Sequence, residues 1–113
     1  MNCNIITTKG FVSQLKKLAK RYKSIKDDLR SLAKELTEDP FAGISLGKNI
    51  YKIRMSINSK GNGKSGGARV IYHTVLIEKN GADITLLSIY DKSEQDSISD
   101  KEIQRLIKKN NLD

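Results

Sequence analysis

The sequence has few of the residues that build disulfides and metal centres. Cys3 is the only cysteine and His73 the only histidine, so no disulfide can form within the chain. A zinc site built from histidine and cysteine ligands is not expected for the same reason. The sequence also lacks an apolar run long enough to cross a bilayer, and it lacks a secretory signal pattern. These absences predict a cytoplasmic protein that needs no metal, no small-molecule cofactor and no membrane.

Acidic residues are missing from the middle of the chain. The net charge is +8 and the isoelectric point is about 9.6, a balance that favours a polyanionic partner. No Asp or Glu occurs between Asp39 and Glu78. A solvated basic surface, which is common, and a surface that binds nucleic-acid phosphates both fit this pattern, and we favour the second. The cations of this acid-free window are Lys48, Lys52, Arg54, Lys60, Lys64 and Arg69.

The chain's 113 residues suffice for one compact domain, residues 1–113, which begins with two helices. Apolar residues recur at helical spacing from about Lys9 to Tyr22, with lysines on the other face. A second amphipathic helix follows, and Ser24-x-x-Asp27 resembles a capping box at its start. Asp39-Pro40 should end it, because proline disfavours helix in the residue before it. We expect the two helices to form an antiparallel hairpin.

The rest of the chain predicts strands and one more helix. Apolar and polar residues alternate from Tyr51 to Ile57, which indicates a strand with one apolar face. Two further strands, Ala68–Ile77 and Ile84–Tyr90, flank a turn signal at Asn80-Gly81. Strands joined by hairpins neighbour each other, so an antiparallel meander should form. Met1–Thr8 could add a short edge strand, and Ser99-x-x-Glu102 should start a short C-terminal helix. The fold class is α+β, with the helical hairpin packed on the sheet.

A glycine-rich loop, residues 58–67, joins the first two strands of the meander. Gly61-x-Gly63-x-x-Gly66 matches a dinucleotide-binding pattern, and Gly63-Lys64-Ser65 resembles the end of a phosphate-binding P-loop. Both motifs require a helix after the loop, and a strand is expected here instead. The loop should therefore deliver Arg69 to the sheet rim, where the polar residues of the preceding strand point. A plainer alternative is that Arg69 only caps the loop through hydrogen bonds to carbonyls.

The meander should bring a group of cations and one tyrosine to the sheet face opposite the helices. Arginine binds phosphate through a rigid fork of donors, and a lysine among other cations has a lowered pKa and could act as a base. RNA supplies its own nucleophile, the 2′-hydroxyl, so such a group could cleave RNA without a metal. The predicted catalytic residues are Lys52, Arg54, Arg69, Tyr90 and Lys92, and the predicted RNA contacts are Lys48, Lys60, Lys64 and His73. The alternatives are an RNA-binding module without catalysis and an interaction protein whose basic face binds only an acidic partner.

The sequence resembles the RelE/HigB family of bacterial toxins over most of its length, and most closely the HigB-like branch. The likeness rests on the helical hairpin, the Tyr51-Lys52-Ile53-Arg54 strand, the run Gly63–Tyr72 and the ending Leu86–Lys92. This resemblance implies a toxin of a toxin–antitoxin pair that cleaves messenger RNA in the decoding site of the ribosome. It also implies inhibition by a cognate antitoxin.

The resemblance assigns roles to individual positions. It implies that Lys52, Arg54 and Arg69 are active-site cations, and that Lys92 replaces an arginine of RelE. RelE carries a catalytic tyrosine in its C-terminal segment, but no tyrosine follows Tyr90 here. HigB toxins have a tyrosine at the end of the last strand, so Tyr90 is expected to take that place.

Overall fold

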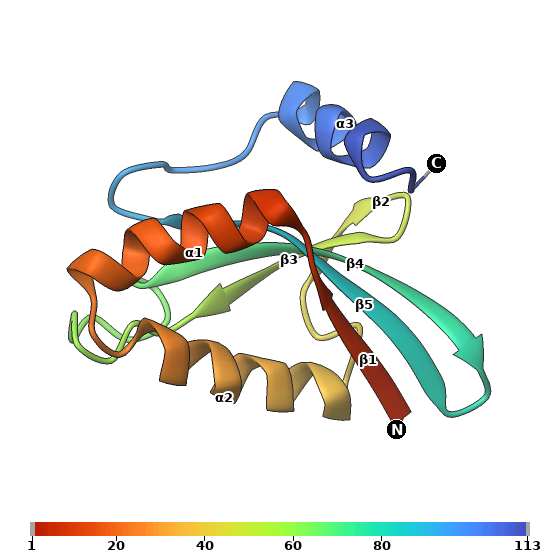
Figure 1. Ribbon diagram of the computed structural model, residues 1–113, viewed down its shortest axis with the longest axis horizontal. Helices are drawn as coiled ribbons and strands as arrows, with labels where there is room; N and C mark the ends of the chain where they lie inside the picture. The colour runs from red at the N-terminus through yellow and green to blue at the C-terminus, as the bar shows by residue number, and fades with distance from the viewer. Residues whose placement is uncertain (1, 113) are drawn as a thin grey trace.

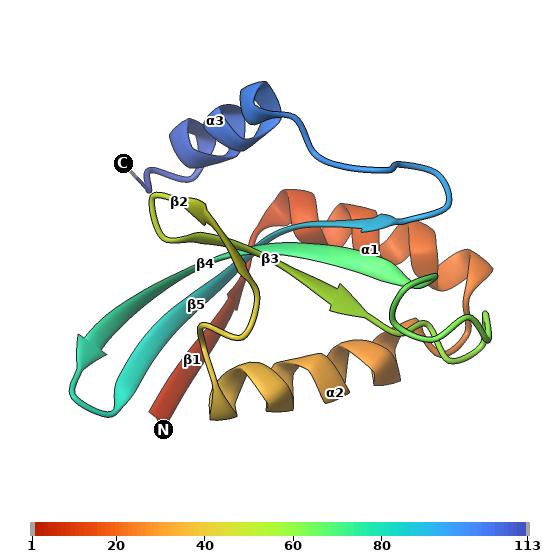
Figure 2. The same cartoon turned by 180° about the vertical axis from the view of Figure 1, so that it is seen from behind.

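The structure is a computed structural model that describes residues 2–112, so Met1 and Asp113, the ends of the predicted domain, lie outside the described residues. Three helices pack against a five-stranded sheet in the order β1-β5-β4-β3-β2 (Figure 1). The view from behind shows the same arrangement, with α3 apart from α1 and α2 (Figure 2). The elements are β1 (Asn2–Thr7), α1 (Lys9–Arg21), α2 (Ile25–Glu38), β2 (Ile44–Gly47), β3 (Ile50–Met55), β4 (Ala68–Glu78), β5 (Gly81–Asp91) and α3 (Asp100–Lys109).

The two N-terminal helices form where the sequence predicted them. α1 starts after Thr8, whose hydroxyl accepts a hydrogen bond from Phe11 N–H at 3.2 Å. α2 ends at Glu38, directly before the Asp39-Pro40 pair. The apolar stripes of both helices join one core cluster with the sheet. The prediction of an α+β fold with a helical hairpin on a sheet is confirmed.

The capping box predicted at Ser24-x-x-Asp27 is wrong. Ser24 has helical backbone angles, and its hydroxyl accepts no hydrogen bond from a backbone N–H of α2. That hydroxyl donates to the Asp28 carboxylate at 2.7 Å and accepts a hydrogen bond from Ser59 N–H at 2.8 Å. Asp28 also accepts from Asn58 N–H. The start of α2 therefore holds the glycine-rich loop, and this long-range contact replaces the local cap.

β3, β4 and β5 form the predicted antiparallel meander, but the sheet edges differ from expectation. β1 is an edge strand, as expected, and it pairs in parallel with β5, so the sheet is mixed. β2, at the other edge, was missed because its four residues are too few to show a period of two. The β4–β5 hairpin turns at Lys79 and Asn80, one residue before the predicted Asn80-Gly81 turn, because Gly81 already pairs with Glu78.

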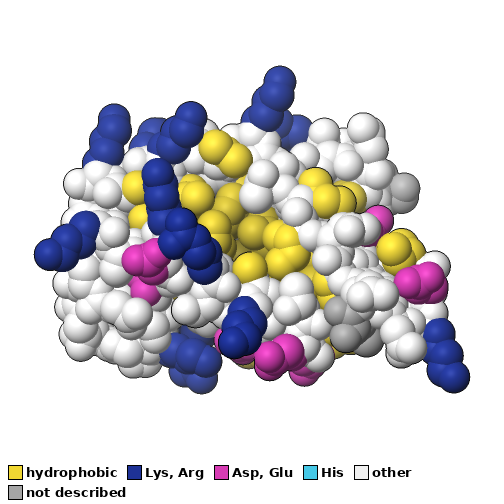
Figure 3. All heavy atoms as spheres, turned by 60° about the horizontal axis from the view of Figure 1, so that its bottom comes forward, with side chains coloured by type: hydrophobic (Ala, Val, Ile, Leu, Met, Phe, Trp, Pro, Cys, Tyr) yellow, Lys and Arg dark blue, Asp and Glu magenta, His cyan; other side chains and the backbone are white. Residues whose placement is uncertain are grey.

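The sheet buries apolar side chains on both faces. The larger cluster lies under α1 and α2, and it includes Phe11, Leu36, Ile53, Val70, Tyr72 and Leu86. Parts of this face stay open: Cys3, Ile5 and Leu29 are only half-buried. Seen from below, apolar side chains gather in the middle of the molecule with cations around them (Figure 3). Among residues 2–112, no helix combines the length and apolarity that a membrane span requires.

α3 covers part of the opposite face. Its first turn is capped as predicted, because the Ser99 hydroxyl accepts a hydrogen bond from Glu102 N–H at 3.1 Å. Ile103 and Ile107 pack on Ile71 and Leu87 of the sheet in a second, smaller cluster. α3 therefore covers only part of the face opposite the helical hairpin, and this face stays open toward the glycine-rich loop.

The end of β5 carries a buried carboxylate that joins three parts of the fold. Asp91 is 2% exposed and accepts hydrogen bonds from the Tyr22 hydroxyl at 2.5 Å, the Lys60 ammonium at 2.8 Å and Ser93 N–H at 2.9 Å. Burial alone would raise the pKa of Asp91, but these hydrogen bonds outweigh it and hold the pKa well below its usual range. We call this group, Asp91 with Tyr22, Lys60 and Ser93, the Asp91 network. It ties α1 and the glycine-rich loop to β5.

Replacing Asp91 with asparagine should lower the free energy of unfolding by about 3 kcal/mol at neutral pH, because Lys60 then keeps a largely buried charge without its counter-ion. The folded pKa is depressed, so the stabilisation is complete above the ordinary pKa of 3.8 and declines as the pH falls below it. Urea unfolding of the wild type and Asp91→Asn between about pH 7 and about pH 3 should show the two stabilities converging at low pH.

Asp27→Asn is the matched control for that comparison. The Asp27 side chain is exposed and pairs with Arg30 at the surface, where ion pairs stabilise little. Equal stability of Asp91→Asn and wild type at neutral pH would contradict the role given to the Asp91 network.

Candidate active site

Four of the five predicted catalytic residues start from neighbouring positions in the sheet. Arg54 of β3 lies directly opposite Arg69 of β4, and Arg69 lies directly opposite Tyr90 of β5. Residues directly opposite point to the same face, and Lys52, two residues before Arg54, shares it. Tyr90 packs in the cluster under α3, so this is the face that α3 partly covers. The strand register therefore places these side chains in one region.

A cleft of about 610 Å³ opens over this region, lined in part by the segment between β5 and α3. Its size falls in the range of sites that hold a small organic ligand. The cleft contains four of the five predicted catalytic residues and one of the four predicted RNA contacts. Its lining is formed by the cations Lys52, Arg54, Lys64, Arg69 and Lys92, the carboxylates Glu35 and Asp96, and Ala42, Gly43, Ile44, Ile53 and Ser97.

Arg69 is bound to the glycine-rich loop more tightly than a free rim residue would be. The residue is 8% exposed, and its guanidinium donates to the carbonyls of Lys64, Ser65 and Ala68 at 3.1 to 3.2 Å. The alternative that Arg69 caps the loop is therefore present in the structure. Because Arg69 also lines the cleft, its charge reaches the cleft while its donors hold the loop.

The loop ends on a glycine that no larger residue could replace. A Cβ at Gly67 would lie 2.1 Å from the carbonyl oxygen of Met55, on the neighbouring strand. The Gly67 carbonyl in turn accepts a hydrogen bond from Lys92 N–H at 3.0 Å. The loop leads directly into β4 and not into a helix, so the arrangement of a P-loop does not form. Close backbone packing at Gly67 sets the position of Arg69 and Lys92 together.

Tyr90 lies deeper than the sequence predicted. It is 6% exposed, and its ring belongs to the apolar cluster under α3. Within residues 2–112 its buried hydroxyl finds no hydrogen-bond partner. Burial raises the pKa of Tyr90, while the nearby charge of Arg69 lowers it. Since the pKa stays above its ordinary value, the phenol is protonated at neutral pH and can donate a proton or a hydrogen bond.

Two carboxylates that the sequence analysis did not single out lie among the cations. Asp96 pairs with Lys92, four residues earlier, and Glu35 of α2 lies 3.7 Å from the Lys64 ammonium. A hydrogen bond from Lys92, with further attraction from Lys52, lowers the pKa of Asp96. Asp96 is therefore ionised at neutral pH. An exposed anion already occupies part of the cationic cleft.

Three predicted RNA contacts lie away from the cleft. The Lys60 ammonium is committed to Asp91, and its side chain is only 15% exposed. Lys48 lies at the exposed β2–β3 turn, about 20 Å along the strand from Arg54. His73 is buried, and burial lowers its pKa, so its imidazole is neutral at pH 7. The structure supports none of the three as part of one site with the cleft cations.

A comparison with families of known proteins gives a match. The family described as "RelE toxin of RelE / RelB toxin-antitoxin system" matches residues 6–111 of the chain. That match spans nearly the whole described structure, including every residue of the cleft. No curated protein matches the sequence. The family description does not single out a HigB-like branch, so that assignment remains a prediction.

Replacing Arg69 with alanine should lower the free energy of unfolding by about 1.5 to 3 kcal/mol, because loop carbonyls lose charged donors. Arg54→Ala is the matched control, since Arg54 is exposed and lies directly opposite Arg69. We expect Arg54→Ala to change stability by less than about 0.5 kcal/mol. Urea unfolding of both variants measures the difference, and similar stabilities would contradict the loop-holding role of Arg69.

Proposed function

Because the chain belongs to the RelE family of toxins from toxin–antitoxin systems, we propose that it cleaves messenger RNA on the ribosome, in the cytoplasm. Toxins of this family are generally endoribonucleases that inhibit translation, and the family pairs each toxin with a cognate antitoxin. The chain's own geometry supports the finer steps of the proposal, which concern the RNA and the residues that act on it.

The observation that carries the proposal is the concentration of cations in one cleft. Lys52, Arg54 and Arg69 come from adjacent strands, and Lys92 enters from the segment after β5. Like charges this close repel, so the arrangement is favourable only with anions among them. Asp96 and Glu35 partly serve as such anions, and an RNA phosphate has the same charge sign and likewise offers two anionic acceptor oxygens.

The proposed reaction is an internal transfer at one phosphate of the RNA. The 2′-oxygen attacks the phosphorus and loses its proton, while the bond from phosphorus to the 5′-oxygen breaks. The 5′-oxygen leaves and takes up a proton, so the products are a 2′,3′-cyclic phosphate and a 5′-hydroxyl. Negative charge grows on the phosphate oxygens in the transition state, and preorganised cationic donors stabilise it there more than in the substrate.

We assign the roles in this reaction by the solvent exposure of each side chain. Arg54 is exposed and carries a forked donor, so we assign it to the phosphate oxygens. Lys52 is half-buried among cations and is our candidate for proton transfer. Lys92 adds charge once its pairing with Asp96 opens. Arg69 contributes positive charge to the cleft while its guanidinium holds the loop.

The geometry also favours one alternative, RNA binding without cleavage. Tyr90 is buried, and the Arg69 guanidinium donates three hydrogen bonds to backbone carbonyls. Two of the five predicted catalytic groups are therefore not free to contact RNA. A chain of this kind would arrest translation by occupying the ribosome. No new messenger ends would then appear.

Arg54→Ala should reduce the rate of messenger cleavage about 10²- to 10³-fold at saturating ribosomes, the usual cost of losing one transition-state donor. Arg54→Lys should recover only part of the rate, because lysine keeps the charge and loses the fork. Cell-free translation followed by mapping of messenger 5′ ends measures both.

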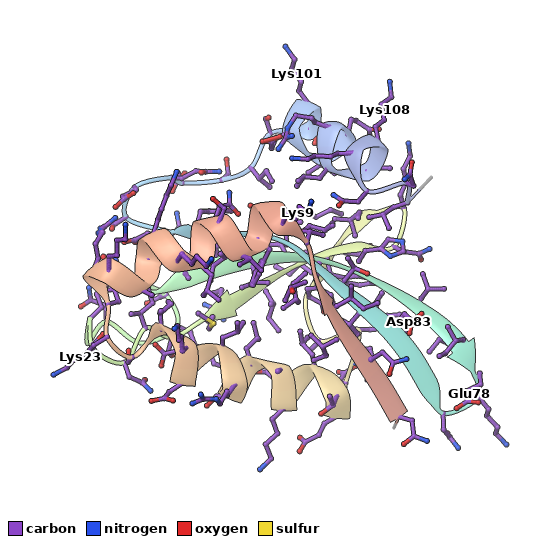
Figure 4. The ribbon with its side chains drawn as sticks, in the orientation of Figure 1. Lys9, Lys23, Glu78, Asp83, Lys101 and Lys108 are labelled. Carbon is purple, nitrogen blue, oxygen red and sulfur yellow. The ribbon has the colours of Figure 1, made fainter. Side chains whose placement is uncertain are left out.

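Lys101→Ala is the control for charge alone, since Lys101 projects into solvent from α3, away from the cleft (Figure 4). It should cleave at the wild-type rate. Translation arrest by wild-type protein without new messenger ends would refute cleavage and favour the binding alternative.

A further inference from the structure

One wall of the cleft is apolar and is exposed without a packing role. Ile44 of β2 lies directly opposite Lys52 of β3, so the two side chains point to the same face, with Cβ atoms about 5 Å apart. Ile44 is 68% exposed, the highest value among the large apolar residues of the described chain. It belongs to neither apolar cluster of the core. Burial therefore does not explain an isoleucine at this position.

The wall is held in place by the residues before it. Gly43 N–H donates to the Tyr72 hydroxyl at 3.1 Å, and Tyr72 is fully buried. A Cβ at Gly43 would lie 2.7 Å from the carbonyl oxygen of Lys52, so the segment is packed closely against β3. Ile44 itself is β-branched, which restricts its side-chain rotamers. The apolar surface is thus presented at a fixed position beside a cation.

The cleft therefore offers two kinds of contact side by side. Its centre, with Lys52, Arg54 and Arg69, is cationic, and its edge at Ala42 and Ile44 is apolar. A ligand that fits both needs an anionic group held a short distance from a weakly polar one. A nucleotide has this form, because a base is linked to its phosphate through one sugar. Apolar and aromatic side chains commonly receive unstacked bases in this way.

We propose that Ile44, with the backbone of Ala42 and Gly43, forms a subsite that contacts the base of the nucleotide whose phosphate binds at Lys52. This inference rests on the proposed cleavage of RNA and adds a specificity-determining residue to it. The contact is with a base face, so it selects bases by stacking area and not by hydrogen-bond pattern. Purines, which present the larger face, should be favoured at this position.

The test pairs a protein change with removal of the base. Single-turnover cleavage is measured on ribosomes programmed with messengers that carry either a normal or an abasic nucleotide at each position around the cut. Ile44→Ser should slow cleavage of the normal messenger about tenfold. When the abasic nucleotide is the one that would contact Ile44, Ile44→Ser and wild type should cleave at nearly the same rate. Ile44→Phe, which keeps an apolar face, should cleave the normal messenger at least as fast as wild type.

The control is Leu76→Ser, which replaces another exposed apolar residue of the sheet, 52% exposed and outside the cleft. It should cleave like wild type on every messenger. Both serine variants should unfold at the wild-type urea concentration, since neither side chain is buried in the core.

The outcomes separate the two proposals. If wild-type protein cleaves no messenger, the proposed function fails. If wild type cleaves and Ile44→Ser either matches it or is slowed equally on normal and all abasic messengers, the base subsite alone is overturned. If Ile44→Ser cleaves normally but binds the antitoxin more weakly, the apolar wall belongs to the protein interface and the base subsite is again overturned.

Discussion

The position of the cleft depends on one buried carboxylate. Asp91 lies between Tyr90 and Lys92, and it accepts hydrogen bonds from α1 through Tyr22 and from the glycine-rich loop through Lys60. A buried ion without partners is costly, so the folded chain must bring these donors together. In doing so it fixes the end of β5 against the loop that carries Lys64 and leads to Arg69. One internal ion pair thereby sets the relative position of groups far apart in sequence.

The cleft concentrates positive charge, and the backbone around Arg69 reduces the electrostatic repulsion that results. Arg54 and Arg69 lie directly opposite each other, a pairing that repels. The carbonyls of Lys64, Ser65 and Ala68 turn toward the Arg69 guanidinium, and their dipoles oppose its charge. This arrangement needs a loop that can bend its carbonyls inward, which the positive φ angles of Gly61 and Gly63 permit. The glycines therefore let the loop carbonyls accept hydrogen bonds from the Arg69 guanidinium.

Local patterns predicted the elements well, and long-range contacts account for what they missed. The helical periods ending near Tyr22 and Asp39 and the alternation after Tyr51 depend on nearby residues, so they could be read from sequence. The Asp91 network could not, because Tyr22 and Asp91 are 69 positions apart. The sequence around Lys60 indicates a free loop cation, and nothing near it in the chain shows that its ammonium pairs with the buried Asp91. The short β2 strand carried no period at all.

The sequence could predict which residues gather at the cleft, but not which of them are free to contact a ligand. Tyr90 lies near the end of a strand in both the prediction and the structure. Only the packing of α3 shows that its hydroxyl is buried, without a hydrogen-bond partner among residues 2–112. An unpaired buried hydroxyl is unfavourable. A partner that reached it would gain a hydrogen bond without breaking an existing one. The segment between Lys92 and Ser99 borders this site, and its pairing through Asp96 is exposed to solvent. Exposed ion pairs stabilise little, so in the proposed reaction an RNA phosphate would replace the Asp96 carboxylate at Lys92 with a small loss of stability.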